Sequence, residues 1–238
     1  MKNINNKNDN DKKNSRSIKK SRAPDAETAY IFNSQLFNNS ASKILFLVLG
    51  LYLSDKNPNK STNYSMVLSI VPILYVLFGY NLTYSDVNKY FGIPSLWTPN
   101  DGETYGGESD ATYSSGSDFI FQLVFAIVAV TISINSFSGP ITDNITRAFV
   151  IFISVAIYCL TTSWSWGGGW LSEAGFLDFS GSSIVFVVGA VISIVFSFLL
   201  KPKLGEEPKI MKLTEKNDAL TNILITIGMI SFNGGSQL

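Results

Sequence analysis

The chain has 238 residues and no net charge at pH 7; 46% of its residues are hydrophobic and only 15% are charged. The apolar residues gather in long blocks, which excludes one large soluble domain and predicts an integral membrane protein. The single cysteine, Cys159, excludes an intrachain disulfide. Because the sequence has no histidine, Ser/His/Asp catalysis, histidine-ligated zinc or haem and a histidine proton relay within the chain are excluded as well.

The first 24 residues are rich in Asn, Lys and Ser and have no apolar run, so we predict a disordered basic tail. Eight of the 18 Lys and Arg lie within the first 22 residues. Such a tail could contact anionic lipid or nucleic acid, but the favoured interpretation is a solvated cytoplasmic tail, with no nucleic-acid partner. We expect residues 25–238 to form one membrane domain.

Residues 25–53 are a weak candidate for a first span. Polar residues interrupt the segment and leave one apolar run, residues 44–53. This run is about half of the roughly twenty residues that a bilayer requires. The sequence therefore predicts a re-entrant or surface-lying helix here. The alternative is a span whose polar face packs against other helices.

Four later segments are each near bilayer length, and they predict an all-α, polytopic transmembrane helical bundle. These segments are residues 62–84, 118–138, 147–164 and 182–200. A sixth apolar run, residues 219–235, brings the expected total to about five or six helices. Pro72 falls inside the second span, where neighbouring helices can compensate the lost hydrogen bond.

The loops predict the orientation of the bundle. Five lysines lie between residues 201 and 216, which places that loop in the cytoplasm by the positive-inside rule. The long acidic loop 86–117 and the loop 161–181 then both fall outside. A faint calcium-loop pattern in the acidic loop, the less favoured interpretation, rests on Asp101, Glu103 and Gly106.

The loop 161–181 holds three tryptophans, a glycine triplet and an aspartate. Trp164, Trp166 and Trp170 suit the headgroup level of a membrane, so an ordinary aromatic belt explains them. Asp178 suits two roles, because an ionisable residue beside a membrane helix is a functional candidate and the same residue can cap the fifth span. The residues alone leave both open.

Several motifs resemble the ammonium transporter family, including its Rh relatives. Trp-Ser-Trp-Gly-Gly-Gly-Trp-Leu at 164–171, followed by Leu-Asp-Phe-Ser-Gly at 177–181, is similar to the signature loop of that family. Three further matches keep the family's order: Val-Leu-Phe-Gly-Tyr at 76–80, Phe-Gln at 121–122 with Phe-Ala at 125–126, and Phe-Asn-Gly-Gly-Ser at 232–236. The resemblance implies a partial ammonium-transporter fold that runs from about residue 25 to the last residue.

The resemblance also implies a set of substrate-binding residues. The family's outer aromatic cage corresponds to Phe121, Phe125, Trp166 and Ser236, and its gate to Phe125 with Phe232. Asp178 corresponds to an aspartate that supports the site without being a transported ligand. An aromatic face attracts a small cation by about 0.5 to 2 kcal/mol, and a serine hydroxyl can accept a hydrogen bond from it. Without the resemblance, these phenylalanines would be interpreted as plain core.

Two departures from the family separate two hypotheses about function. Phe186 stands where the family has its first pore histidine, and the chain matches the first of two inverted halves plus one helix. The preferred hypothesis is transport of ammonium or ammonia by a homo- or hetero-trimer in the plasma membrane. The alternative is a truncated or non-conducting member that acts as a partner subunit or is inactive. A membrane enzyme has no nucleophile–base pair or metal cluster behind it, and no cofactor is expected.

Overall fold

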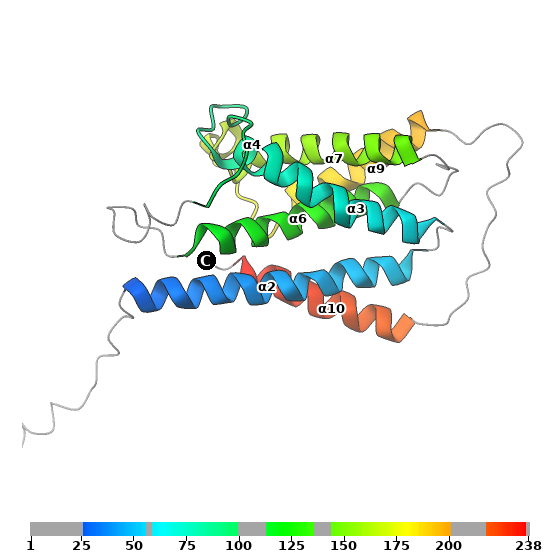
Figure 1. The fold of residues 1–238 in the computed structure, drawn as a ribbon, viewed down its shortest axis with the longest axis horizontal. Helices are drawn as coiled ribbons and strands as arrows, with labels where there is room; N and C mark the ends of the chain where they lie inside the picture. Colours follow the sequence, from blue (N-terminus) through cyan, green and yellow to red (C-terminus); the bar gives the residue numbers. More distant parts are fainter. Residues whose placement is uncertain (1–25, 56–58, 100–112, 136–143, 201–217, 237–238) are drawn as a thin grey trace, which may run out of the picture.

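The structure, a computed structural model, describes residues 26–55, 59–99, 113–135, 144–200 and 218–236. Within these ranges the secondary structure is helical, with no strand (Figure 1). The α-helices are α2 (Ala26–Ser54), α3 (Lys60–Leu74), α4 (Tyr80–Tyr84), α6 (Ser115–Asn135), α7 (Asn144–Ser165), α8 (Trp170–Glu173), α9 (Val188–Leu199) and α10 (Asp218–Gly235). Two π-helical turns, η1 (Tyr75–Gly79) and η2 (Ser182–Val187), continue α3 into α4 and lead into α9.

Five helical segments are long and apolar enough to cross a membrane. They are Ala29–Ser54, Lys60–Tyr84, Ser115–Ile134, Asn144–Glu173 and Ser182–Leu199, and the apolar part of α10, Ala219–Gly235, is shorter. The four spans predicted after the first segment are therefore confirmed as helices to within a few residues, with Pro72 inside α3 as expected. The predicted all-α membrane fold is confirmed as well.

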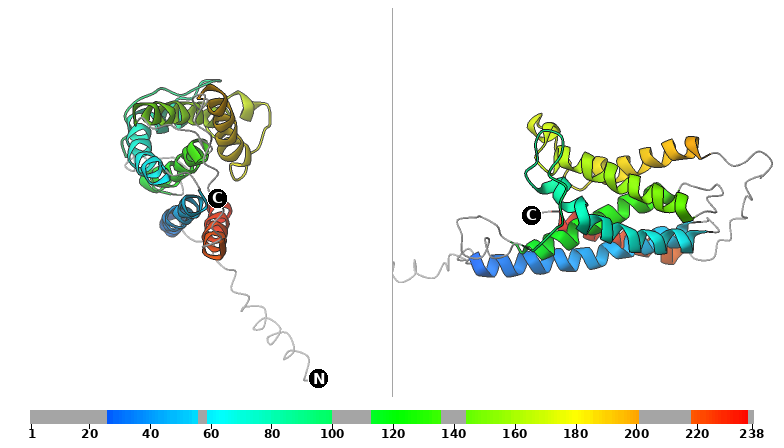
Figure 2. Two further views of the ribbon diagram at one scale, coloured as in Figure 1. Left: turned by 90° about the vertical axis from the view of Figure 1, so that its right-hand side faces the viewer. Right: turned by 45° about the horizontal axis from the view of Figure 1, so that its top comes forward.

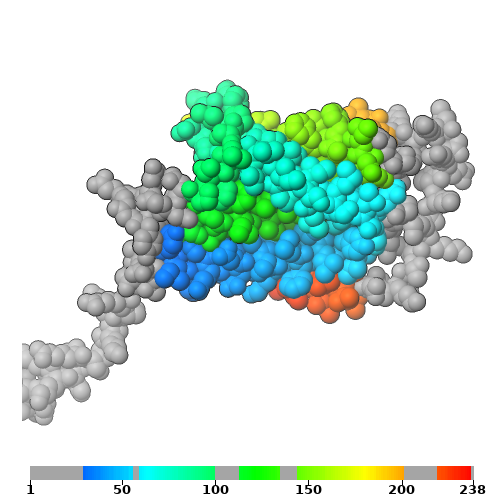
Figure 3. Space-filling model, viewed as in Figure 1, coloured from blue at the N-terminus to red at the C-terminus, as the bar shows by residue number. Residues whose placement is uncertain are grey.

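The expectation that the first segment is too short to span is wrong, because α2 is one continuous helix of 29 residues. Its placement relative to the membrane stays a prediction. Figure 3 shows α2 running along the flank of the body. The prediction used the length of the uninterrupted apolar run, residues 44–53, as its criterion. The packing of this helix depends instead on a stripe of apolar residues at helical spacing. The buried residues of this stripe are Phe37, Ala41, Ile44, Leu47 and Val48.

The helices form two groups (Figure 2). Helices α3, α6, α7 and α9 pack together as one group. Helices α2 and α10 lie side by side as a pair, and α2 packs against α6 of the first group. Cys159 of α7 is free and fully buried, so its side chain faces neighbouring helices.

Glycine lets α2 and α10 approach closely, as small residues do between membrane helices. A Cβ atom at Gly228 of α10 would lie 2.5 Å from the Cβ of Leu47 in α2, whereas nothing lies within 4 Å of the corresponding position at Gly234. These two glycines of one helix form a matched pair.

We expect Gly228→Ala to destabilise the protein by about 1–3 kcal/mol, because an overpacked contact forces the helices apart. Gly234→Ala is expected to be neutral or slightly stabilising, because alanine favours a helix over glycine. Thermal unfolding of both variants in the same lipid nanodiscs measures the difference. Equal midpoints for the two variants would contradict the close contact between α2 and α10.

Candidate functional site

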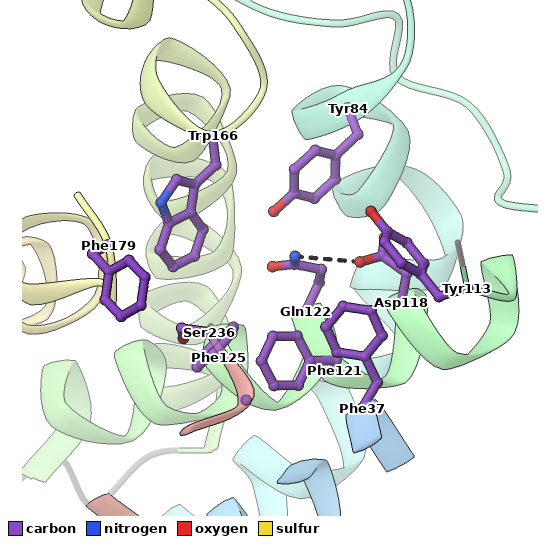
Figure 4. Close-up of a pocket in the computed structure, with 11 residues that line it drawn as sticks. Phe37, Tyr84, Tyr113, Asp118, Phe121, Gln122, Phe125, Trp166, Phe179 and Ser236 are labelled. Atoms are coloured by element: carbon purple, nitrogen blue, oxygen red, sulfur yellow. Dashed lines mark hydrogen bonds between the residues drawn. The ribbon is translucent and has the colours of Figure 1, made fainter. Parts of the chain in front are cut away.

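A pocket of about 400 Å³ lies at the end of the bundle where α6 begins and where α4, α7 and α10 end (Figure 4). Segments far apart in the sequence meet there, because the ends of these helices come together at one level. The lining residues are Phe37, Tyr84, Tyr113, Asp118, Phe121, Gln122, Phe125, Trp166, Phe179, Gly235 and Ser236.

The four residues predicted as the aromatic cage all line this pocket. The rings of Phe121 and Phe125 lie 4.6 Å apart, and those of Phe125 and Trp166 lie 5.6 Å apart. Ser236 completes the group from the end of α10, and its hydroxyl donates to the carbonyl oxygen of Phe232 at 2.9 Å. Since this bond uses the hydroxyl proton, the Ser236 oxygen keeps its lone pairs for a donor in the pocket.

An apolar stack lies below the pocket. The ring of Phe232, which is fully buried, packs edge-on against Phe125 at 4.4 Å. Phe186 follows at 5.5 Å from Phe232. Of the predicted gate pair, Phe125 therefore lines the pocket and Phe232 lies behind it. Phe186, which the family resemblance aligns with a pore histidine, adds a third apolar ring to the stack.

The loop after α7 places Trp166 by a set of backbone contacts. A Cβ atom at Gly167 would lie 2.1 Å from the carbonyl oxygen of Thr83, so only glycine permits this approach to the end of α4. Gly168 follows in the left-handed region at φ 80°. The Trp166 indole then donates from Nε1 to the carbonyl oxygen of Asp178 at 2.6 Å, which fixes the ring against the pocket.

The other two tryptophans of the loop lie outside the pocket. Their rings, of Trp164 and Trp170, are 5.9 Å apart. Trp164 donates from Nε1 to the carbonyl oxygen of Tyr90 at 2.7 Å. The aromatic-belt interpretation therefore suits these two residues, while Trp166 is the one that faces the pocket.

Asp178 does not line the pocket, and its carboxylate caps the start of η2. The backbone N–H of Ser182 donates to Oδ1 at 2.9 Å, and those of Ser183 and Ile184 donate to Oδ2 at 2.8 and 2.9 Å. Of the two roles open from the sequence, capping is the one that the structure displays. The Asp178 carboxylate caps η2, and its backbone carbonyl oxygen accepts from Trp166. Asp178 therefore also connects the fifth span to the pocket wall.

The polar side of the pocket was not predicted. Asp118 lies in the first turn of α6 and accepts hydrogen bonds from the Tyr80 hydroxyl and from Gln122 Nε2, the latter at 3.4 Å. In the sequence, the feature that could have indicated this polar side is a single acid near the start of an apolar helix, four residues before Gln122. Burial raises the pKa of Tyr113, and the negative charge of the nearby Asp118 raises it further, so this phenol is neutral at pH 7.

Three features noted in the sequence lie outside the described residues. They are the basic tail, the faint calcium-loop pattern and the lysine-rich loop. In the part of the chain that the structure describes, no group of three or more Cys, Asp or Glu side chains could hold a metal ion.

The sequence model of the Ammonium Transporter Family matches residues 32–238. The chain belongs to the ammonium transporter family. It is 28% identical to the ammonium transporter of Aquifex aeolicus over 199 residues, which are 80% of this chain and 46% of that relative. It is 27% identical to the ammonium transporter of Bacillus subtilis over 217 residues, which are 89% of this chain and 52% of the relative. This family member thus spans about half the length of these relatives.

A solved structure shares the fold of this ammonium transporter family member. The crystal structure of Candida albicans Mep2 matches with a TM-score of 0.69 at 19% identity, over 90% of this chain and 50% of Mep2. The family and the helical arrangement predicted from the motifs are therefore confirmed. The apolar helices and the family together make the chain an integral membrane protein.

Proposed function

We propose that this family member binds ammonium in the aromatic pocket and takes part in moving ammonium or ammonia across a membrane. The observation that carries the proposal is the meeting of Phe121, Phe125, Trp166 and Ser236 in one pocket. They come from three separate parts of the chain, and together they offer aromatic surface and a hydroxyl acceptor to one small ligand.

The chemistry of the pocket suits a small cation. Each suitably placed ring attracts a cation by about 0.5–2 kcal/mol, with tryptophan the strongest. The Ser236 oxygen offers an acceptor for one N–H of the ion. Aromatic surface replaces water around the ion without requiring many oxygen ligands, which favours ammonium over strongly hydrated cations.

The stack of Phe125, Phe232 and Phe186 suits a neutral species better than an ion. Carrying a charge through hydrocarbon is costly, whereas neutral ammonia loses only hydrogen bonds. We therefore propose that the pocket binds the ion and that the stack opposes its passage as an ion. Parting of the Phe125 and Phe232 rings would open the route.

The orientation, the assembly and the membrane are also proposals. The lysine-rich loop 201–216 follows the end of α9 that lies away from the pocket, so the positive-inside rule places the pocket on the outer side. We propose the plasma membrane as its location and a homo- or hetero-trimer as its assembly, as the family resemblance implies.

Uptake of isotope-labelled methylammonium into proteoliposomes that contain the full chain tests transport. Uptake above that of empty liposomes is expected. Phe125→Trp, which enlarges the first ring of the stack, should reduce uptake at least severalfold while the protein stays folded. Binding without any uptake would contradict transport and would favour the non-conducting partner hypothesis.

A further inference from the structure

We propose that Asp118, Gln122 and Tyr84 form a second, polar wall of the pocket that binds a monovalent cation carrying N–H groups. The inference rests on the proposed function, since it identifies how the same pocket would recognise its ligand. The aromatic cage offers π faces and one hydroxyl, whereas this wall offers a full negative charge and two further acceptor oxygens.

The first observation is the state of Asp118. Asp118 is only 9% exposed. Each of its carboxylate oxygens accepts a hydrogen bond from a different donor, Oδ2 from the Tyr80 hydroxyl and Oδ1 from Gln122 Nε2. An ionised carboxylate is an acceptor only, so two donors suit the charged form, and the first turn of α6 favours a negative charge further. Among the described residues Asp118 has no ion pair, so a bound cation would neutralise its charge.

The second observation is the direction of the Gln122 amide. Because the Asp118 carboxylate can only accept, the Gln122 amide must turn its nitrogen toward Asp118 and its oxygen away. Gln122 Oε1 is buried, and within the described part of the chain it has no hydrogen-bond partner. Figure 4 shows this oxygen facing the open space across from Trp166.

The third observation is the hydroxyl of Tyr84, at the end of α4. It too is buried without a hydrogen-bond partner among the described residues. Figure 4 shows the Tyr84 oxygen facing the same space as Gln122 Oε1. Buried polar atoms are nearly always paired, and two such atoms converging on one aromatic pocket indicate that a ligand pairs with them.

The chemistry of the wall selects its ligand. Ammonium and methylammonium carry a positive charge for Asp118 and N–H donors for Gln122 Oε1 and Tyr84 Oη. Neutral ammonia lacks the charge, and tetramethylammonium lacks the N–H groups. Potassium has the charge, but the acceptor oxygens of Gln122, Tyr84 and Ser236 are too few to replace the water that a bare metal cation loses.

Asp118→Asn should weaken binding because it removes the negative charge. Its amide can still satisfy both neighbours, by accepting from Gln122 Nε2 and donating to the Tyr80 hydroxyl oxygen, so the Gln122 acceptor stays in the pocket. Tyr84→Phe should weaken binding less, because it removes one neutral acceptor. Since the Tyr84 hydroxyl has no hydrogen-bond partner within the described residues, its removal leaves none of their buried groups unsatisfied and is not expected to lower the thermal stability of the empty protein.

Equilibrium binding of labelled methylammonium to the full chain in lipid nanodiscs tests the wall, with potassium and tetramethylammonium as competitors. We expect the affinity to fall by about tenfold or more in Asp118→Asn and by about two- to tenfold in Tyr84→Phe. Neither competitor should displace methylammonium at equal concentration. Glu173→Gln is the matched control, because it removes an exposed acid paired with Lys89 outside the pocket, and its affinity should be unchanged.

Each outcome decides between the proposals. Unchanged affinity in Tyr84→Phe and Asp118→Asn, with uptake intact, would overturn the polar wall and leave transport standing. Binding with the expected losses but without uptake would support the wall and contradict transport. A wild-type chain that binds no methylammonium would overturn the wall outright. If Asp118→Asn fails to fold, the affinity and the unfolding midpoint of Tyr84→Phe decide the matter.

Discussion

Asp178→Ala is expected to lower the free energy of unfolding by about 2–4 kcal/mol, since hydrogen bonds to a charged group contribute more than neutral ones. The substitution leaves the backbone N–H groups of Ser182, Ser183 and Ile184 without their acceptor at the start of η2. Thermal or denaturant unfolding in nanodiscs measures the loss.

Two variants control this expectation. Asp178→Asn keeps one acceptor oxygen but turns an N–H₂ group toward backbone donors, so its loss should approach that of alanine. Glu173→Ala removes an acid of the same loop that forms, among the described residues, an exposed ion pair with Lys89 at 3.9 Å, which contributes little. A loss in Glu173→Ala as large as that in Asp178→Ala would show that the capping geometry is not what stabilises this region.

Trp166→Ala is expected to have a large effect on ligand binding. It removes the indole face from the pocket, and it removes the bond from Nε1 to the carbonyl oxygen of Asp178 that fixes the pocket wall. We expect the affinity for methylammonium to fall by about tenfold or more, which is within the range of one lost cation–π contact plus a disordered wall. Trp166→Phe keeps an aromatic face and should lie between.

Trp164→Ala is the matched control for that prediction. Trp164 comes from the same loop and makes the same kind of bond, from Nε1 to the carbonyl oxygen of Tyr90, but it does not line the pocket. It should cost a similar amount of stability and leave the affinity unchanged. If Trp164→Ala weakened binding as much as Trp166→Ala, general disturbance of the loop would explain both effects.

The sequence predicted the membrane spans because long apolar blocks have few alternatives in a chain of this composition. It did not predict the length of α2, where exposed polar residues such as Asn38 and Asn39 break the apolar run but leave the buried stripe intact. A count of consecutive apolar residues cannot see such a stripe, whereas helical periodicity can.

The aromatic half of the pocket was predictable from the sequence, and the polar half was not. Trp166 and Phe125 belong to motifs whose order and spacing indicate a shared site. Tyr84 and Asp118 belong to no such motif, and they come close only because α4 ends where α6 begins. Single ionisable or phenolic residues at helix ends are common, so only their convergence on the pocket distinguishes them.

The role of Asp178 shows the same division. Its position before the fifth span allowed both capping and a functional role, and the choice depended on where the backbone N–H groups of η2 point. That geometry follows from the left-handed turn at Gly181, with φ 72°, immediately before η2. A local conformation of this kind is not visible in apolar patterning.

The most direct test of ammonium binding in this pocket is solid-state NMR of the full chain in lipid nanodiscs, with isotope-labelled ammonium and labelled tryptophan rings. Bound ammonium is predicted to transfer magnetisation to one tryptophan ring, and Trp166→Phe should abolish the transfer while Trp164→Phe and Trp170→Phe preserve it. Bound ammonium that contacts only Trp164 or Trp170, or only the lipid headgroups, would contradict the assignment of this pocket as the ligand site.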